Sequence, residues 1–239
     1  MGVAMAAATY PSLYSERVPP VKVQPSAVSL PMQSALHSSL DGLERLMNVR
    51  LEDDIRRLHV IRSRKMADDY KREILPYYWG YCSAVVSRGV YRHDSILNYV
   101  AVWCVDCGEY SKGLFVAEHA LQSFYERGRL RHTPGLRGFK RNLAETLVES
   151  IADAALKHPH LAEMRSSLVH VYDITRLHDM NDPISFKLHK ALALCLQDSD
   201  PHQALFHCQE AYALRPLKQL AKIQQYLEQR IGEANEPKN

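Results

Sequence analysis

The stretch from Leu51 to Gly89 reads LEDDIRRLHVIRSRKMADDYKREILPYYWGYCSAVVSRG, and its pattern decides the fold class. Its first half is densely charged but repeats apolar residues at helical spacing, which predicts an amphipathic helix with one packing stripe. The stripe is the expected oligomer interface, and it consists of Leu51, Ile55, Leu58 and Met66. Basic residues recur at heptad spacing along another side, at Arg50, Arg57, Arg64 and Lys71. One helix is therefore expected to present both a packing seam and a basic ridge.

Pro76 interrupts this stretch, and the charged helix is expected to end or bend at Leu75 because proline lacks a backbone donor. An aromatic cluster follows at once. It is expected to anchor two elements to each other, and it consists of Tyr77, Tyr78, Trp79 and Tyr81. Gly89 is a plausible C-cap for the second helix.

The chain is expected to have four parts. Residues 1–32 are rich in proline and predict a disordered arm. Residues 33–75 form a long charged helical region, where a further apolar stripe (Leu36, Leu40, Leu43 and Met47) indicates an oligomer contact. We therefore expect oligomerisation and DNA contact in this region. Residues 76–231 form a helical-hairpin domain, and residues 232–239 form a frayed tail.

Capping signals predict two helical hairpins in the third part. Asp94 and Gly108 bound a helix over 95–107, and its partner over 110–127 stops at Gly128. Asp182-Pro183 and Asp200-Pro201 open the second pair, over 184–197 and 202–214. Further helices are expected over 142–157, 161–177 and 217–231. The fold class is therefore all-α, with long charged N-terminal helices followed by hairpins that are tetratricopeptide-like in places.

The amino-acid composition by itself excludes few classes of function. The chain has 239 residues and a formal net charge of +3, too small to imply a nucleic-acid partner without a favourable distribution. Five cysteines, an odd number, read as buried thiols of a cytoplasmic protein. Cys104 and Cys107 have the spacing of a zinc or redox pair, but a structural zinc site needs four ligands, which favours packing. We expect no metal, no cofactor and no membrane span.

No catalytic residue stands out. The acidic pairs Asp53-Asp54 and Asp68-Asp69 are explained as solvated helix faces with basic neighbours one turn away. The chain has no glycine-rich phosphate loop, no GxSxG and no HExxH motif. ATP hydrolysis, serine hydrolysis and zinc hydrolysis therefore have no visible apparatus.

A second basic segment, RGRLRHTPGLRGFKR over 127–141, contains no acid and several helix breakers. Uncompensated positive charge on a loop suits phosphate neutralisation, although a solvated connector is the simpler alternative. The candidate DNA contacts on the charged helix are Arg57, Arg64, Lys65, Lys71 and Arg72. Those on the loop are Arg131, Arg137, Lys140 and Arg141.

From Lys71 onward the chain resembles the small terminase subunit of cos-packaging, contractile-tailed temperate bacteriophages, the GpM family. The resemblance rests on KREILPY at 71–77, DSIL at 94–97, Trp103 with DCGEY at 106–110, and the segments 117–121, 187–190 and 204–214. It covers about two thirds of the chain, in the family's order. The first 50 residues and the central loop show little that matches, and the family's basic C-terminal tail is replaced by GEANEPKN.

The resemblance implies a subunit that assembles as a ring-like homo-oligomer, selects double-stranded viral DNA at the cos site and delivers it to the ATPase-bearing large subunit. The place of action would be the cytoplasm of the bacterial host. Family labels often read endonuclease subunit, a label that we take to describe the whole complex. Two alternatives remain: a helical-repeat scaffold that binds protein without DNA, and an intrinsic metal-dependent endonuclease.

Overall fold

The computed structural model describes the backbone of residues 30–89, 91, 93–122, 125–126, 129–130 and 141–235. The chain divides into two compact units, Met1–Gly42 and Leu43–Asn239. The described residues of the first unit form the N-terminal part of helix α1, Leu30–Val60, whose remainder belongs to the second unit.

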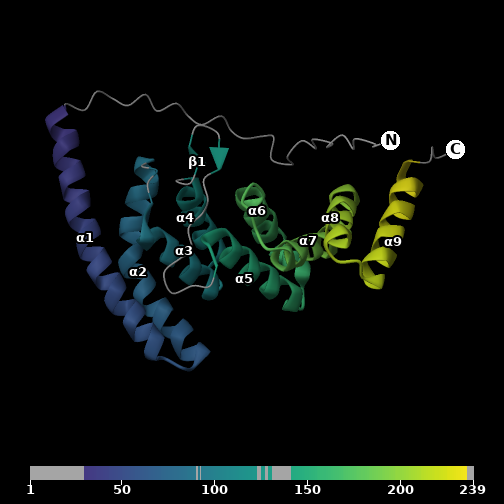
Figure 1. The fold of residues 1–239 in the computed structure, drawn as a ribbon, viewed down its shortest axis with the longest axis horizontal. Coiled ribbons are helices and arrows are strands. Elements are labelled where there is room, and N and C mark those ends of the chain that lie inside the picture. Colours follow the sequence, from purple (N-terminus) through teal and green to yellow (C-terminus); the bar gives the residue numbers. More distant parts are fainter. Residues whose placement is uncertain are drawn as a thin grey trace. The chain divides into compact units, whose positions relative to one another are not determined.

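The described part of the second unit is almost entirely helical, which confirms the predicted all-α class (Figure 1). A two-residue strand pair, Tyr125–Glu126 (β1) with Arg129–Leu130 (β2), is the exception among the described residues. The helices after α1 are α2 (Arg64–Arg88), α3 (Ser95–Asp106), α4 (Tyr110–Gln122), α5 (Leu143–Lys157), the 3-10 helix η1 (Leu161–Met164), α6 (Arg165–Thr175), α7 (Asp182–Leu196), α8 (Pro201–Leu214) and α9 (Lys218–Asn235).

Side-chain caps and left-handed glycines set the helix ends where the sequence predicts them. The Asp94 carboxylate accepts the backbone N–H of Ile96 at 2.8 Å, which starts α3. Gly89 ends α2 with φ 63°, and Gly108 follows α3 with φ 82°. Such left-handed backbone favours glycine because glycine has no Cβ. These local signals confirm the predicted end of α2 and the predicted start and end of α3.

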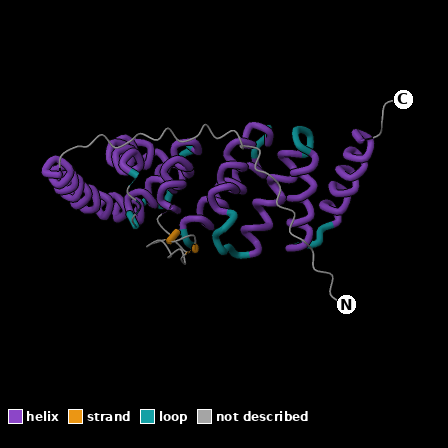
Figure 2. Tube along the Cα trace, turned by 90° about the horizontal axis from the view of Figure 1, so that it is seen from above, coloured by secondary structure: helices purple, strands orange, loops and turns teal. Residues whose placement is uncertain are grey.

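Antiparallel pairs of helices form the core. The two predicted hairpins, α3 with α4 and α7 with α8, are both present, and α5 packs against α3 and α7 between them. Figure 2 shows the helices from α3 to α9 standing side by side. In the first hairpin, α4 comes so close to α3 that a Cβ on Gly113 would lie 2.9 Å from the Ala101 carbonyl oxygen. The tetratricopeptide likeness of these pairs stays a prediction.

The predicted end of the helix at Leu75 was wrong, because α2 continues through Pro76 to Arg88, while the alternative, a bend at this point, stays a prediction. The break lies earlier, at Ile61–Ser63, where the Ser63 hydroxyl caps α2 by accepting from the Met66 N–H. Pro76 is exposed, while Leu75 and Tyr78 beside it are buried. Packing on the inner face therefore outweighs the backbone bond that proline removes on the outer face, a loss of about 3 kcal/mol.

Two other predicted boundaries shift. The helix predicted over 110–127 ends at Gln122, ahead of the β pair. Helix α7 begins at Asp182, and its N-cap is Asn181, whose backbone and side-chain N–H groups both donate to the Glu145 carboxylate. A tertiary partner thus replaces the local cap that the sequence predicts.

Candidate nucleic-acid interface

The C-terminal part of α1 and the N-terminal part of α2 form a hairpin held by one buried carboxylate. Asp54 is buried and accepts hydrogen bonds from the Tyr70 hydroxyl at 2.5 Å and the Tyr78 hydroxyl at 2.6 Å. Arg50 adds an ion pair at 3.5 Å. Burial, and then the neighbouring carboxylate, raise the pKa of Tyr78, so its phenol stays protonated and donates. We call this group the Asp54 clamp.

The tip of the hairpin carries a run of positive charge. Residues 55–67 read IRRLHVIRSRKMA and contain no acid. The basic residues of this run, all exposed, are Arg56, Arg57, Arg62, Arg64 and Lys65, which we call the basic tip. Arg56 and Arg57 both reach back to Asp53, at 3.4 and 3.1 Å. Within the described residues the other three are not paired with any carboxylate, which leaves their charge open to a phosphate.

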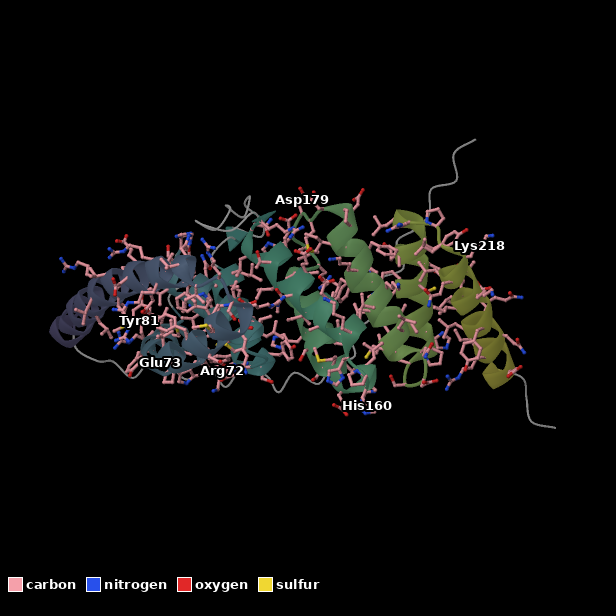
Figure 3. The ribbon with its side chains drawn as sticks, turned by 90° about the horizontal axis from the view of Figure 1, so that it is seen from below. Arg72, Glu73, Tyr81, His160, Asp179 and Lys218 are labelled. Carbon is pink, nitrogen blue, oxygen red and sulfur yellow. The ribbon has the colours of Figure 1, made fainter. Side chains whose placement is uncertain are left out.

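Lys71 serves a different purpose from the basic tip. Its ammonium group lies 2.8 Å from Asp106 on α3 and 3.1 Å from Asp68, and only 14% of the side chain is exposed. Burial lowers the pKa of Lys71, but the two carboxylates outweigh this, so its pKa rises overall. Arg72, on the outer surface beside Glu73 (Figure 3), pairs with Asp69 at 2.9 Å. Lys71 thus joins the base of the hairpin to α3.

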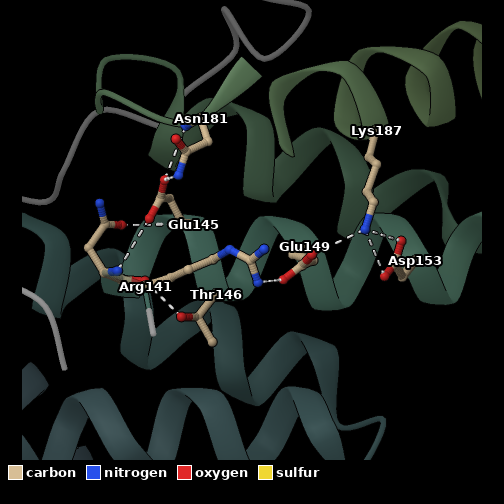
Figure 4. A network of polar contacts seen from close by, with 8 residues as sticks. Arg141, Glu145, Thr146, Glu149, Asp153, Asn181 and Lys187 are labelled. Carbon is tan, nitrogen blue, oxygen red and sulfur yellow. Dashed lines mark hydrogen bonds and ion pairs between the residues drawn. The ribbon is translucent and has the colours of Figure 1, made fainter. Parts of the chain in front are cut away.

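Arg141 belongs to a network between α5 and α7 (Figure 4). Its guanidinium pairs with Glu149, which also accepts from Lys187 at 3.1 Å. Lys187 bridges onward to Asp153 at 3.0 Å. The charge of Arg141 is therefore largely compensated by a structural partner. The remaining loop candidates, Arg131, Arg137 and Lys140, lie outside the described residues.

The predicted oligomer seam divides between the inside and the outside of the protomer. Leu51 is only 3% exposed, and Ile55 and Leu58 are partly covered. Met66 is exposed at the basic tip. Leu51 already packs within the protomer, so it offers little surface to a partner. Among the residues of α1 whose burial is described, the large apolar side chains left open are instead Leu43, Leu46 and Val49, with Val60 near the tip.

The cysteine pair lies at the end of α3, inside the fold. Burial raises the pKa of Cys104 to about 12 and that of Cys107 to about 11. Neither thiol is therefore ionised near neutral pH, and ionisation is what metal binding and redox attack need. Over the residues that the structure describes, no group of three or more His, Cys, Asp and Glu side chains could hold a metal ion. None of the described helices is long and apolar enough to cross a membrane.

Sequence reasoning missed Arg56 and Arg62, because a search at heptad spacing selects only one residue per two turns. The signal that finds them is the absence of acids from residues 55–67. The structure brings Arg57, Arg64 and Lys65 together at the tip of the hairpin, and places Lys71 and Arg141 in ion-pair networks elsewhere.

The described residues thus form an all-α body that carries a basic helical hairpin. Comparison with known proteins identifies the family. The family model described as "Phage small terminase subunit" matches residues 48–183 of this chain. A curated relative, the "Terminase, endonuclease subunit" of Escherichia phage P2, is 30% identical over 195 residues, which cover 80% of this chain and 75% of the relative. The chain therefore belongs to the phage small terminase subunit family, whose members take part in packaging viral DNA. No solved structure matches the chain significantly.

Proposed function

We propose that this protein is the DNA-recognition subunit of a phage packaging terminase. It assembles as a homo-oligomeric ring in the cytoplasm of the bacterial host, binds double-stranded viral DNA at the cos site and recruits the large subunit with its ATPase. The observation that carries the proposal is the basic tip, with five exposed basic side chains and no acid over residues 55–67. Membership of the small terminase subunit family supports the packaging role.

The tip suits phosphate binding because its charge is presented on a rigid support. The Asp54 clamp fixes the crossing of α1 and α2, and Lys71 ties the hairpin to α3 through Asp106. Arg62, Arg64 and Lys65 need no rearrangement to meet a phosphate backbone. One tip is a weak binder, but an oligomer repeats it, and linked weak contacts add by effective concentration.

Contacts of this kind position DNA without reading its sequence. Sequence preference for cos then needs another element, and the loop residues Arg131, Arg137 and Lys140 are our candidates. Arg72 contributes at the edge of the interface, since its pair with Asp69 is exposed and weak. Lys71 and Arg141 act by holding helices together, and we give them no direct DNA contact.

The test compares Arg62→Glu/Arg64→Glu with a matched charge reversal, Lys218→Glu/Lys222→Glu on α9. The control residues are exposed at the other end of the helical array from α2. Fluorescence anisotropy on cos and random duplexes at two salt concentrations should show at least tenfold weaker binding for the tip variant on both DNAs. The salt slope should fall by about 0.9 for each phosphate that the variant no longer neutralises. Less than threefold weakening at the tip, or equal weakening in the control, would show that the interface lies elsewhere.

The name of the phage P2 relative raises a second possibility, intrinsic cleavage. The same purified chain incubated with cos DNA and Mg²⁺, without a large subunit, decides it. We expect intact DNA, since cutting needs converging carboxylates that hold the metal. Mg²⁺-dependent nicking of the DNA by the chain alone would show that the protein is a nuclease and would contradict our proposal. If the chain bound no duplex DNA even at low salt, the remaining function would be the protein-binding scaffold.

A further inference from the structure

Arg57 is a member of the basic tip that the fold holds from both helices of the hairpin. On α1 its guanidinium pairs with Asp53 at 3.1 Å. On α2 it contacts the Tyr70 phenol, through charge and through a side-chain hydrogen bond in which the guanidinium donates. The Arg57 side chain is nevertheless 64% exposed. Arg57 is therefore fixed in position and still open to a ligand from solvent.

Tyr70 is placed beside Arg57 by the buried carboxylate of Asp54. The Tyr70 hydroxyl donates to that carboxylate at 2.5 Å. Burial, and then the hydrogen bond to Asp54, raise the pKa of Tyr70, so the phenol keeps the proton that it donates. Asp54 and Arg57 lie one turn apart on α1 and are neighbours on the helix surface. A phenol held at Asp54 therefore presents its oxygen to the Arg57 guanidinium, and a phenol oxygen can accept while its proton is donated elsewhere.

Arg56, the neighbour of Arg57 in the chain, is held in a different way. It shares the Asp53 carboxylate, at 3.4 Å, and its Nε donates to the Glu52 backbone carbonyl at 3.3 Å. Both of these partners lie on α1. Of the two arginines, it is Arg57 whose described contacts extend to α2. The orientation of Arg57, unlike that of Arg56, therefore depends on a residue of the opposite helix.

We propose that Tyr70 is a positioning residue for DNA binding, which holds the Arg57 guanidinium in the orientation that meets a phosphate. The inference rests on the proposed function, since it needs the basic tip to bind DNA. A guanidinium has more N–H donors than Asp53 and Tyr70 occupy, so donors remain for a phosphate oxygen. One Asp53 carboxylate is shared by Arg56 and Arg57, which leaves this group a net positive charge. An arginine that is already held loses less side-chain freedom when it binds.

The experiment compares Tyr70→Phe with Tyr78→Phe in the full chain. Each variant removes one hydrogen bond to the Asp54 carboxylate, at 2.5 and 2.6 Å, but of the two tyrosines it is Tyr70 that contacts Arg57. Fluorescence anisotropy on a random duplex should show a Kd raised about threefold or more for Tyr70→Phe, and less than about 1.5-fold for Tyr78→Phe. The salt slope should fall in Tyr70→Phe alone, by about 0.9 for each phosphate that is no longer neutralised. A purely structural role predicts the opposite order, because Tyr78 is the more buried tyrosine.

A double-mutant cycle with Arg57→Gln is the decisive step. Tyr70→Phe should change the Kd no further in the Arg57→Gln background, and should keep its full effect in the matched Arg56→Gln background. Equal effects in the two backgrounds, or a Tyr70→Phe variant with the affinity and salt slope of the wild type, would overturn the inference and leave the proposed function standing. A wild-type chain without salt-dependent binding, or Arg62→Glu/Arg64→Glu with wild-type affinity, would instead overturn the proposed function. Circular dichroism on the same samples shows whether each variant has kept its helices.

Discussion

The Asp54 clamp leads to a quantitative prediction for the variant Asp54→Ala. The substitution removes an acceptor that serves Tyr78 and Tyr70, at 2.6 and 2.5 Å. Hydrogen bonds to a charged group contribute about 1.5–3 kcal/mol each, and the Tyr78 hydroxyl is left buried without its partner. Relief of the buried carboxylate's desolvation offsets part of this loss. We therefore expect a decrease of about 3 kcal/mol in the free energy of unfolding.

The assay is thermal and urea unfolding followed by circular dichroism, at one fixed protein concentration because oligomers unfold in a concentration-dependent way. For a chain of this size, about 3 kcal/mol corresponds to a Tm lower by roughly 6–12 °C. Tyr78→Phe alone should lower stability by about 1.5 kcal/mol. Asp54→Ala/Tyr78→Phe should be no less stable than Asp54→Ala, since the buried hydroxyl has gone together with its acceptor.

The double-mutant cycle also isolates the clamp from general damage. A coupling energy of at least about 1 kcal/mol between Asp54 and Tyr78 is expected, and the matched pair Asp53 with Tyr78 should show none, since Asp53 pairs with Arg56 and Arg57 instead. A decrease of less than about 1 kcal/mol in Asp54→Ala, together with no coupling, would refute the reasoning. DNA affinity should fall in parallel, because the clamp orients the basic tip.

Two further predictions concern the hairpins. Gly113→Ala should lower the free energy of unfolding by about 1–3 kcal/mol, since the new Cβ would lie 2.9 Å from an α3 carbonyl oxygen. Gly80 has open space around it, so Gly80→Ala should instead raise the free energy of unfolding by up to about 1 kcal/mol. Urea midpoints of the two variants check this, and equal effects would contradict it. The Nδ1 atoms of His189 and His207 lie 3.0 Å apart between α7 and α8. Burial lowers the pKa of both imidazoles, to about 4 for His189. The folded pKa lies below the unfolded value of about 6.5, so the contribution of the two neutral imidazoles to folding stability is complete above pH 6.5 and is lost as pH falls towards 4. Tm should therefore drop between pH 6.5 and 4. His207→Gln should make that drop smaller.

Local signals in the sequence predicted much of the fold. Asp94, Asp200 and Gly89 cap helices where their residue types indicate, and the hairpins α3 with α4 and α7 with α8 follow from short turns between capped helices. Such caps depend on a few neighbouring residues, so they can be read from sequence. Pro76 did not end the helix, because the effect of a proline depends on which face of α2 is buried. That face is set by Leu75 and Tyr78, which pack against distant residues.

The candidate site was predicted in outline only. Its basic residues can be seen in the sequence, but their availability depends on carboxylates that come from other helices. Lys71 is neutralised by Asp106 and Arg141 by Glu149, and neither pairing has a local sequence signal. Arg62 and Arg64 are open because, within the described residues, no carboxylate pairs with either of them. Ion pairing between distant segments is a tertiary property, which is why heptad spacing selected Arg64, whose charge is open, together with Lys71, whose charge is not.

The sequence by itself determined the helical class, most helix ends and the family, because capping chemistry, apolar periodicity and the family-like segments are all local patterns. Only the tertiary structure decided which charges are free and which apolar faces are covered. Leu51 and Val49 are two positions apart, yet the first is buried and the second is exposed. Burial depends on what packs against a helix face, and that surface is contributed by residues far away in the chain.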